Sequence, residues 1–282
     1  MAQKDVLETE EYKGVKINIY SHDDPDSPRE WDNIGTMVCW HRNYNLGDVQ
    51  GEKEYGDPED FLAKLAGVDY DDEESELSKL MGGELIDALL KEVEKTHLIM
   101  PLFLYDHSGI SMSTSNAGYP FTCEWDSGQV GWIYVTHEKL IKEYGEDLEH
   151  ALKAGADYLE GEVETYTTYL EGEVYGYMIE DDGDEFGGCW GFYGYDNEKS
   201  GLMEHARDEV DCYLKEKADK EMQEQNRKEK LASFINPFMN GTVWVIRDRD
   251  GELLGSCTEE VLAKEMEKDY GCVVEETAKL GK

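Results

Sequence analysis

The order of apolar and polar positions predicts several helices in this chain. The first begins at Asp57-Pro58, an N-cap residue followed by proline at the first helical position, and ends at Gly67, a typical C-cap. The second follows Gly82-Gly83, and its apolar residues recur every four positions, as on one face of a helix. These residues are Leu85, Leu89 and Val93. Between the two helices, residues 69–76 predict a solvated acidic loop.

A third helical pattern covers residues 148–171 and ends at Gly172. Its apolar residues share one face, whereas the positions between them are largely Glu and Asp. Like charges four residues apart disfavour an isolated helix, so we expect packing against the rest of the fold to hold it. A long helix from Glu198 to about Ser233 carries Lys and Arg residues that balance its acids.

Short runs rich in β-branched and aromatic residues predict strands between the helices. They cover residues 12–20, 35–41, 98–105, 128–135, 173–180 and 189–193. Near the C-terminus, two more strands flank Arg249-Asp250-Gly251, a hairpin signal, and a helix capped near Thr258 follows. The sequence thus predicts an α+β fold, with an antiparallel β-rich core, acidic surface helices and a C-terminal hairpin plus helix. A boundary near Asn236-Pro237 gives a main domain of residues 1–235 and a small unit of residues 236–282.

The most informative property of the composition is its charge, which adds a functional expectation to the predicted fold. The chain contains 65 Asp and Glu residues against 27 Lys and Arg residues, a formal net charge of -38 over 282 residues. Self-repulsion of this size destabilises a compact state, so we expect the charge to have a use outside folding. Disordered acidic chains are poor in aromatic residues, whereas 11% of this chain is Phe, Trp or Tyr, which indicates a folded protein.

The sequence predicts a cytoplasmic location, and no motif in it indicates a cofactor. Its longest apolar run, residues 98–105, is too short to cross a bilayer, and the N-terminus lacks the apolar region of a signal peptide. The six cysteines are scattered without C-x-x-C spacing, which predicts free and mostly buried thiols.

The acidic residues are concentrated in two segments, Asp57 to Glu94 and Glu138 to Glu185. A charge of 38 matches the phosphates of about 19 base pairs of duplex DNA, or roughly 65 Å of helix. A compact domain of this length is about 50 Å across, so the charge per length approaches that of DNA. This favours a protein that mimics DNA and occupies the basic groove of a partner. An acidic coat that only maintains solubility is the alternative.

Under the mimicry hypothesis, carboxylates of both segments pair with Lys and Arg residues of the partner. The candidate residues are Asp69, Asp71, Asp72, Glu73, Glu74, Glu76, Glu160, Glu162, Glu164, Glu171, Asp181, Asp182 and Asp184. The sign of the charge disfavours direct binding to nucleic acid, and no feature indicates a membrane. The sequence leaves the oligomeric state open, a homo-oligomer included.

Two other kinds of site remain open on the residues alone. A hydrolase or metal-dependent enzyme would centre on the polar groups of two loops. These groups are Asp106, His107, Cys123 and Asp126. A hard cation would find carboxylate oxygens and one imidazole in an earlier loop. Its ligands would be His22, Asp23, Asp24 and Asp26. Neither set has the flanking signature of a known hydrolase or calcium site, and Asx turns explain the earlier loop without a metal.

Four strings in the chain resemble an uncharacterised family of acidic proteins that bacteriophages and conjugative elements carry. The strings are EWDNIGTMVCWHRNY, LYDHSGI, CEWDSGQVGWIYV and CWGFYG, and the resemblance covers Trp31 to Tyr195. It implies a mobile-element context, in which acidic anti-restriction and anti-CRISPR proteins are common, and it implies no catalytic residue. Together with the charge, it predicts an inhibitor of a host nucleic-acid-targeting defence complex.

Overall fold

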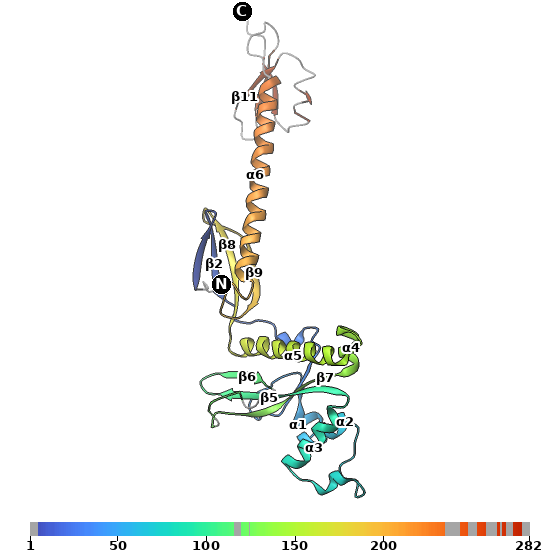
Figure 1. Ribbon diagram of the computed structural model, residues 1–282. Helices are drawn as coiled ribbons and strands as arrows, with labels where there is room; N and C mark the ends of the chain where they lie inside the picture. Colours follow the sequence, from blue (N-terminus) through green and yellow to red (C-terminus); the bar gives the residue numbers. More distant parts are fainter. Residues whose placement is uncertain are drawn as a thin grey trace, which may run out of the picture. The chain divides into compact units, whose positions relative to one another are not determined.

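A computed structural model describes residues 5–115, 120–123, 125–234, 243–247, 253–257, 264–265, 267–268 and 273–277 (Figure 1). Helices occur together with mainly antiparallel sheets, so the α+β class expected from the sequence is confirmed. The chain divides into two compact units, Met1–Ala206 and Arg207–Lys282. The boundary expected at Asn236-Pro237 lies outside the described residues.

The first unit contains a five-stranded sheet in the order β4-β3-β7-β5-β6. Its strands are β3 (Thr36–Cys39), β4 (Val49–Gln50), β5 (His97–Asp106), β6 (Ile110–Thr114) and β7 (Ser127–Thr136). Neighbouring strands are antiparallel, except that β3 and β4 pair in parallel. At the contact of β3 with β7, a Cβ on Gly131 would lie 1.9 Å from the carbonyl oxygen of Val38, so only glycine fits there.

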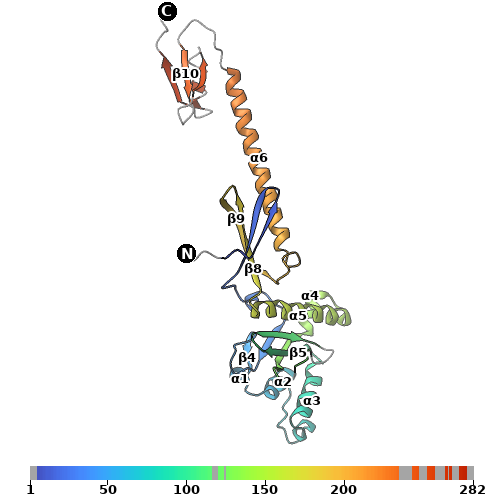
Figure 2. The same ribbon diagram turned by 90° about the vertical axis from the view of Figure 1, so that its left-hand side faces the viewer.

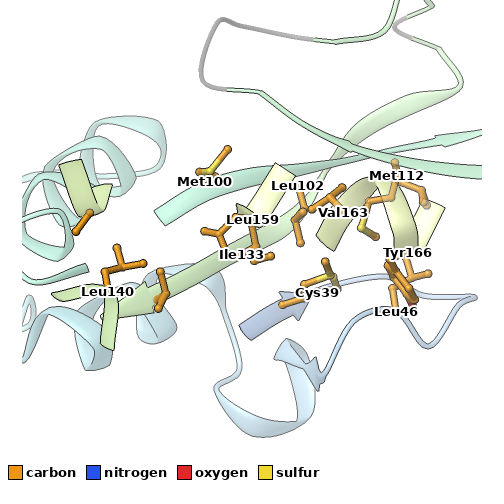
Figure 3. Close-up of a cluster of buried hydrophobic side chains, with 14 residues drawn as sticks. Cys39, Leu46, Met100, Leu102, Met112, Ile133, Leu140, Leu159, Val163 and Tyr166 are labelled. Carbon is orange, nitrogen blue, oxygen red and sulfur yellow. The ribbon is translucent and has the colours of Figure 1, made fainter. Parts of the chain in front are cut away.

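Helices cover both faces of this sheet, as Figures 1 and 2 show. On one face, Met37 and its neighbours pack against Leu159 and Tyr166 of α5 (Leu148–Leu170), in the cluster drawn in Figure 3. On the other face, Val38 and Trp132 pack against α2 and α3. Since successive residues of a strand point to opposite faces, a strand covered on both faces must be apolar on both, and the central part of β5 is a continuous apolar run.

Helices α2 (Pro58–Ala66) and α3 (Gly83–Val93) match the sequence pattern closely. The C-cap residue Gly67 of α2 has a φ of 69°, the left-handed conformation that glycine adopts without strain. The four-residue stripe of α3 is its buried face. Four short helices of the described residues are additional to those predicted: the 3-10 helices η1 (Pro28–Glu30) and η2 (Glu76–Lys79), α1 (Gly51–Glu54) and α4 (His137–Tyr144).

A second sheet of the first unit has the order β1-β2-β8-β9. Its strands are β1 (Glu8–Tyr12), β2 (Val15–Ser21), β8 (Val174–Asp181) and β9 (Asp184–Tyr193). Residues 181–188, dense in Asp and Gly, resemble a loop in sequence, but they join the predicted strands at 173–180 and 189–193 into the continuous β8–β9 hairpin. Its turn residues Asp182 and Gly183 have φ values of 52° and 94°. Asp182 and Gly183 therefore form a tight turn with two positive φ angles, and the residues on either side of it belong to β8 and β9.

The second unit contains most of α6 (Leu202–Phe234) and a three-stranded sheet in the order β11-β10-β12. Its strands are β10 (Val243–Arg247), β11 (Leu253–Cys257) and β12 (Val273–Thr277). The predicted pairing of β10 with β11 is confirmed as antiparallel. The predicted turn Arg249-Asp250-Gly251 and the cap at Thr258 lie outside the described residues. In the described part of the chain, no helix is both long and apolar enough to cross a membrane.

Candidate functional site

The first acidic segment forms an exposed loop between α2 and α3, and all six of its candidate carboxylates face solvent. Their own hydrogen bonds shape the loop: Asp69 accepts from the backbone N–H of Asp71, and Asp72 accepts from that of Glu74. The hydroxyl of Tyr70 donates to Asp60 of α2 over 2.6 Å, and this bond raises the pKa of Tyr70 to about 12. The loop is thus tied to the helix that precedes it.

The second acidic segment extends over α5 and the β8–β9 hairpin. Glu160 and Glu164 on α5 and Glu171 at its C-terminal cap are exposed, as are Asp182 and Asp184 at the hairpin turn, while Asp181 is half-buried. The sequence has no Lys or Arg between positions 153 and 199, and Lys16 of β2, which pairs with Glu180 at 2.8 Å, is a cation supplied to β8 from another strand.

Glu162 departs from this pattern, because its side chain is only 5% exposed and lies on the inner side of α5. Its Oε1 accepts hydrogen bonds from the backbone N–H groups of Ile34 and Gly35, and its Oε2 lies 2.8 Å from Nη1 of Arg29. The expectation that Glu162 is one of the exposed carboxylates of the acidic surface is therefore wrong. The backbone of the segment before β3 needs a buried acceptor, and Glu162 supplies it.

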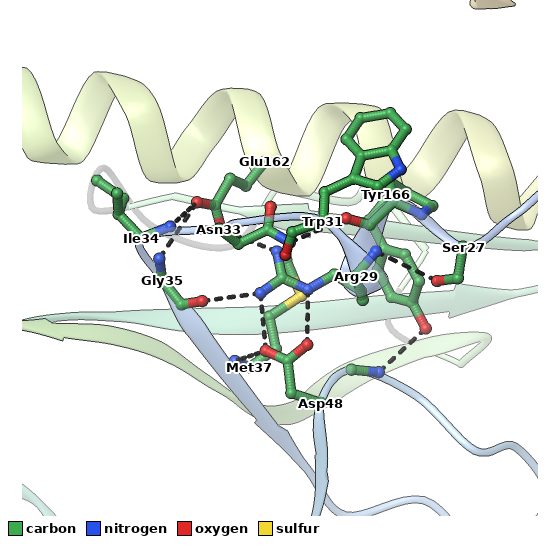
Figure 4. Close-up of polar contacts among 12 residues, drawn as sticks. Ser27, Arg29, Trp31, Asn33, Ile34, Gly35, Met37, Asp48, Glu162 and Tyr166 are labelled. Atoms are coloured by element: carbon green, nitrogen blue, oxygen red, sulfur yellow. Dashed lines mark hydrogen bonds and ion pairs between the residues drawn. The ribbon is translucent and has the colours of Figure 1, made fainter. Parts of the chain in front are cut away.

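Arg29 is the centre of a buried ion network that Figure 4 shows. It lies in the 3-10 helix η1 (Pro28–Glu30), where the Ser27 hydroxyl caps its backbone N–H. Its Nε and Nη2 form a bidentate pair with Asp48, at 3.0 and 2.7 Å, and Nη2 also donates to the carbonyl of Gly35. The network joins η1, β3 and α5, three elements that are distant in sequence.

The electrostatics of this network are unbalanced. Burial alone would favour a neutral guanidinium, but hydrogen bonds to Asp48 and Glu162 outweigh it and raise the pKa of Arg29. One guanidinium thus faces two carboxylates, which leaves a formal charge of about -1 beneath the surface.

A groove of about 350 Å³ opens directly above this network, between η1 and α5. Trp31 and Tyr158, which are 50% and 47% exposed, contribute aromatic surface to it. Its other lining residues are Pro28, Asn33, Asp157, Gly161, Glu162 and Thr165. The groove therefore combines aromatic surface with two carboxylates. In the sequence, the four-residue spacing of positions 157, 161 and 165 marks this face of α5, but an Asp, a Gly and a Thr give no apolar signal.

The structure also brings the four residues of the alternative enzyme site together, three of them through side-chain contacts and Asp106 through its backbone. Oδ2 of Asp126 lies 3.3 Å from Nδ1 of His107 and accepts a hydrogen bond from Sγ of Cys123 at 3.4 Å. Asp106 lies beside them, accepts a hydrogen bond from Tyr44 and donates its backbone N–H to the carbonyl of Asp126. His107 and Cys123 thus each contact the carboxylate of Asp126. Activation of a thiol requires a different contact, one between the base His107 and the nucleophile Cys123.

The proposed cation loop is held by other contacts. The ring of His22 packs against Trp190 at 5.4 Å, and its backbone N–H donates to Val174. Asp23 and Asp24 are exposed, and the backbone carbonyl of Asp26 accepts from the Tyr193 hydroxyl. Within the described ranges, no group of three or more His, Cys, Asp or Glu side chains is placed to hold a metal ion.

Comparison with known proteins adds no relative. No protein-family model, curated protein or solved structure matches this chain.

Proposed function

We propose that this protein is an inhibitor, encoded by a phage or another mobile element, of a host nucleic-acid-targeting defence complex. It acts in the host cytoplasm by presenting carboxylates to a basic groove that normally holds DNA or RNA. The observation that supports this most strongly is the exposure of the acidic loop of residues 69–76. All six of its carboxylates face solvent, and Lys79 is the one cation paired with them among the described residues.

Exposed carboxylates at this density repel one another, and that repulsion is relieved when Lys and Arg residues of a partner approach. Such a surface attracts a basic groove over a distance of about one Debye length, roughly 8 Å at physiological salt. Each exposed pair contributes little by itself, so the affinity comes from many pairs and falls as salt rises.

The test compares two variants that remove the same number of charges from different places. The first replaces the loop acids at 69, 71, 72, 73, 74 and 76 by Asn or Gln. The control replaces six exposed acids of α6, at 208, 211, 216, 219, 221 and 224, in the same way. Each protein is immobilised and exposed to lysate of a candidate host, and the retained nucleic-acid-binding proteins are displaced with a duplex of about 19 base pairs.

We expect the loop variant to lose at least about tenfold in retention, as six weak pairs predict, and the α6 variant to retain its partner. Equal losses in both variants would assign the charge to general solubility and overturn the proposal. If the duplex cannot displace the retained proteins, the two do not compete for one groove, and the proposed mimicry of nucleic acid is wrong.

A second function, hydrolysis, is favoured by one observation, the contact of Asp126 with both Cys123 and His107. The probes are p-nitrophenyl acetate and bis-p-nitrophenyl phosphate. Turnover that falls at least about a hundredfold in both His107→Ala and Cys123→Ser would establish it. Background rates in the wild type would rule it out for these ester classes.

A further inference from the structure

One wall of the groove between η1 and α5 is the ring of Trp31, and contacts within the protein hold this wall in place. The ring of Trp31 meets Tyr193 edge-on, with centroids 5.1 Å apart and an interplanar angle of 88°. The Tyr193 hydroxyl is itself bound to the carbonyl of Asp26. The side-chain amide of Asn33 donates to the carbonyls of Pro28 and Trp31, which holds the backbone of the turn. Trp31 as a whole is still 50% exposed, so an aromatic surface is presented in a defined orientation.

The groove has negative charge both beneath it, in the ion network, and at its rim, on exposed carboxylates. The buried network of Arg29, Asp48 and Glu162 leaves a net charge of about -1 below the floor. Asp157 is exposed among the lining residues, and Glu160 and Glu164 follow on the same helix. A cation in the groove would therefore meet carboxylates and aromatic surface together, and an anion would be repelled by both.

Gly161 keeps the groove open. It lies in the interior of α5, where glycine costs roughly 1 kcal/mol relative to alanine. A Cβ at this position would meet no heavy atom within 4 Å, so packing does not require glycine here. By contrast, a Cβ on Gly155 of the same helix would lie 2.6 Å from Leu140. The space above Gly161 is thus free for a ligand, whereas the space above Gly155 is filled by the protein core.

We propose that this groove binds the guanidinium of an arginine side chain. The planar guanidinium stacks on an indole and donates a fork of hydrogen bonds to a carboxylate such as Asp157, a pairing that an ammonium group makes less well. The inference rests on the proposed function for the source of that arginine, the basic groove of the protein partner. The acidic loop would then supply attraction at a distance, and this groove would supply one specific contact.

The binding test uses the peptide Ac-Gly-Arg-Gly-amide and its citrulline analogue, which has nearly the same shape without the charge. Protein labelled with ¹⁵N-tryptophan is titrated, and the indole signal of Trp31 is assigned by its loss in Trp31→Phe. We expect the arginine peptide to shift this signal with millimolar affinity and the citrulline peptide to bind at least about tenfold more weakly.

Gly161→Leu fills the groove without changing a charge or an aromatic residue, and it improves helix propensity, so this variant is expected to fold. It should weaken arginine binding at least about tenfold. Trp125→Leu is the control, because Trp125 is 96% exposed and lies outside the groove. Equal binding of the two peptides, or arginine binding that survives Gly161→Leu, would overturn the inference.

The same variants separate this inference from the proposed function. If Gly161→Leu retains the lysate partner fully while neutralising the acidic loop releases it, the groove contact is wrong and the inhibitor function stands. If neither change affects retention, the proposed function fails, and the peptide titration alone decides whether the groove binds arginine.

Discussion

Arg29 is a buried cation with three oxygen-bearing partners. Its side chain is 5% exposed and connects Asp48, Glu162 and the carbonyl of Gly35. We expect Arg29→Met to lower the free energy of unfolding by about 3–5 kcal/mol, because it leaves the buried carboxylate of Glu162 without a counter-ion. Urea denaturation followed by near-UV circular dichroism measures the change.

Two further variants test the reason for that loss. Glu162→Gln added to Arg29→Met removes the stranded charge and keeps an acceptor for Ile34 and Gly35, so part of the stability should return. Lys16→Met breaks an exposed pair with Glu180 and should have a much smaller effect. A double variant as unstable as Arg29→Met would contradict this account.

The cysteines differ from one another in exposure to solvent. Burial raises the pKa of Cys39 to about 12, whereas Cys212 is exposed on α6. In the native protein at pH 8, we expect a disulfide reagent to modify Cys212 first and Cys39 only after unfolding, as peptide mass spectrometry would record. Rapid native modification of Cys39 would contradict the buried placement.

The shift of Cys39 also predicts a pH dependence. Its folded pKa lies above the ordinary value of 9.0, so its contribution to stability is complete below about pH 9. That contribution is lost as pH rises toward 12, because the unfolded thiol ionises first. Cys39→Ser should flatten the loss of stability in this alkaline range.

At the scale of elements, the two glycines of α5 make a matched pair. Gly161→Ala should stabilise the protein by about 0.5–1 kcal/mol, because alanine favours a helix and the space is open. Gly155→Ala should destabilise it by about 1 kcal/mol, because the new methyl group overlaps Leu140 in the core. Thermal unfolding of the two single variants gives the signs. Stabilisation by both would contradict the overlap and show that the end of the Leu140 side chain gives way to the new methyl group.

Local signals explain which elements the sequence could predict. The stripe of α3 and the caps of α2 need only their own residues, and both helices lie where expected. Strands at residues 173–180 and 189–193 were predicted, but the hairpin that joins them was not, because the Asp-Gly turn and the glycines of residues 181–188 resemble a loop until a neighbouring strand pairs with them. Glu162 was misplaced for a similar reason. Its partner Arg29 lies 133 residues away, and no local pattern encodes that contact.

At the scale of the whole molecule, a charge of -38 should make stability and binding respond to salt in opposite ways. Added salt screens the repulsion among the carboxylates of the free protein, so its melting temperature should rise. For roughly 1 kcal/mol of relieved repulsion, the rise is about 3 °C between about 20 and 300 mM NaCl. Differential scanning calorimetry measures this directly.

Binding should weaken over the same range, because the salt screens the attraction between the acidic surface and a basic groove. Retention of a partner at several salt concentrations supplies the second curve. If affinity falls while the melting temperature rises, screening of attraction explains the loss, because a loss of fold would lower both. Affinity that does not change with salt would mean that apolar contacts hold the complex, and the acidic surface would then have no part in recognition.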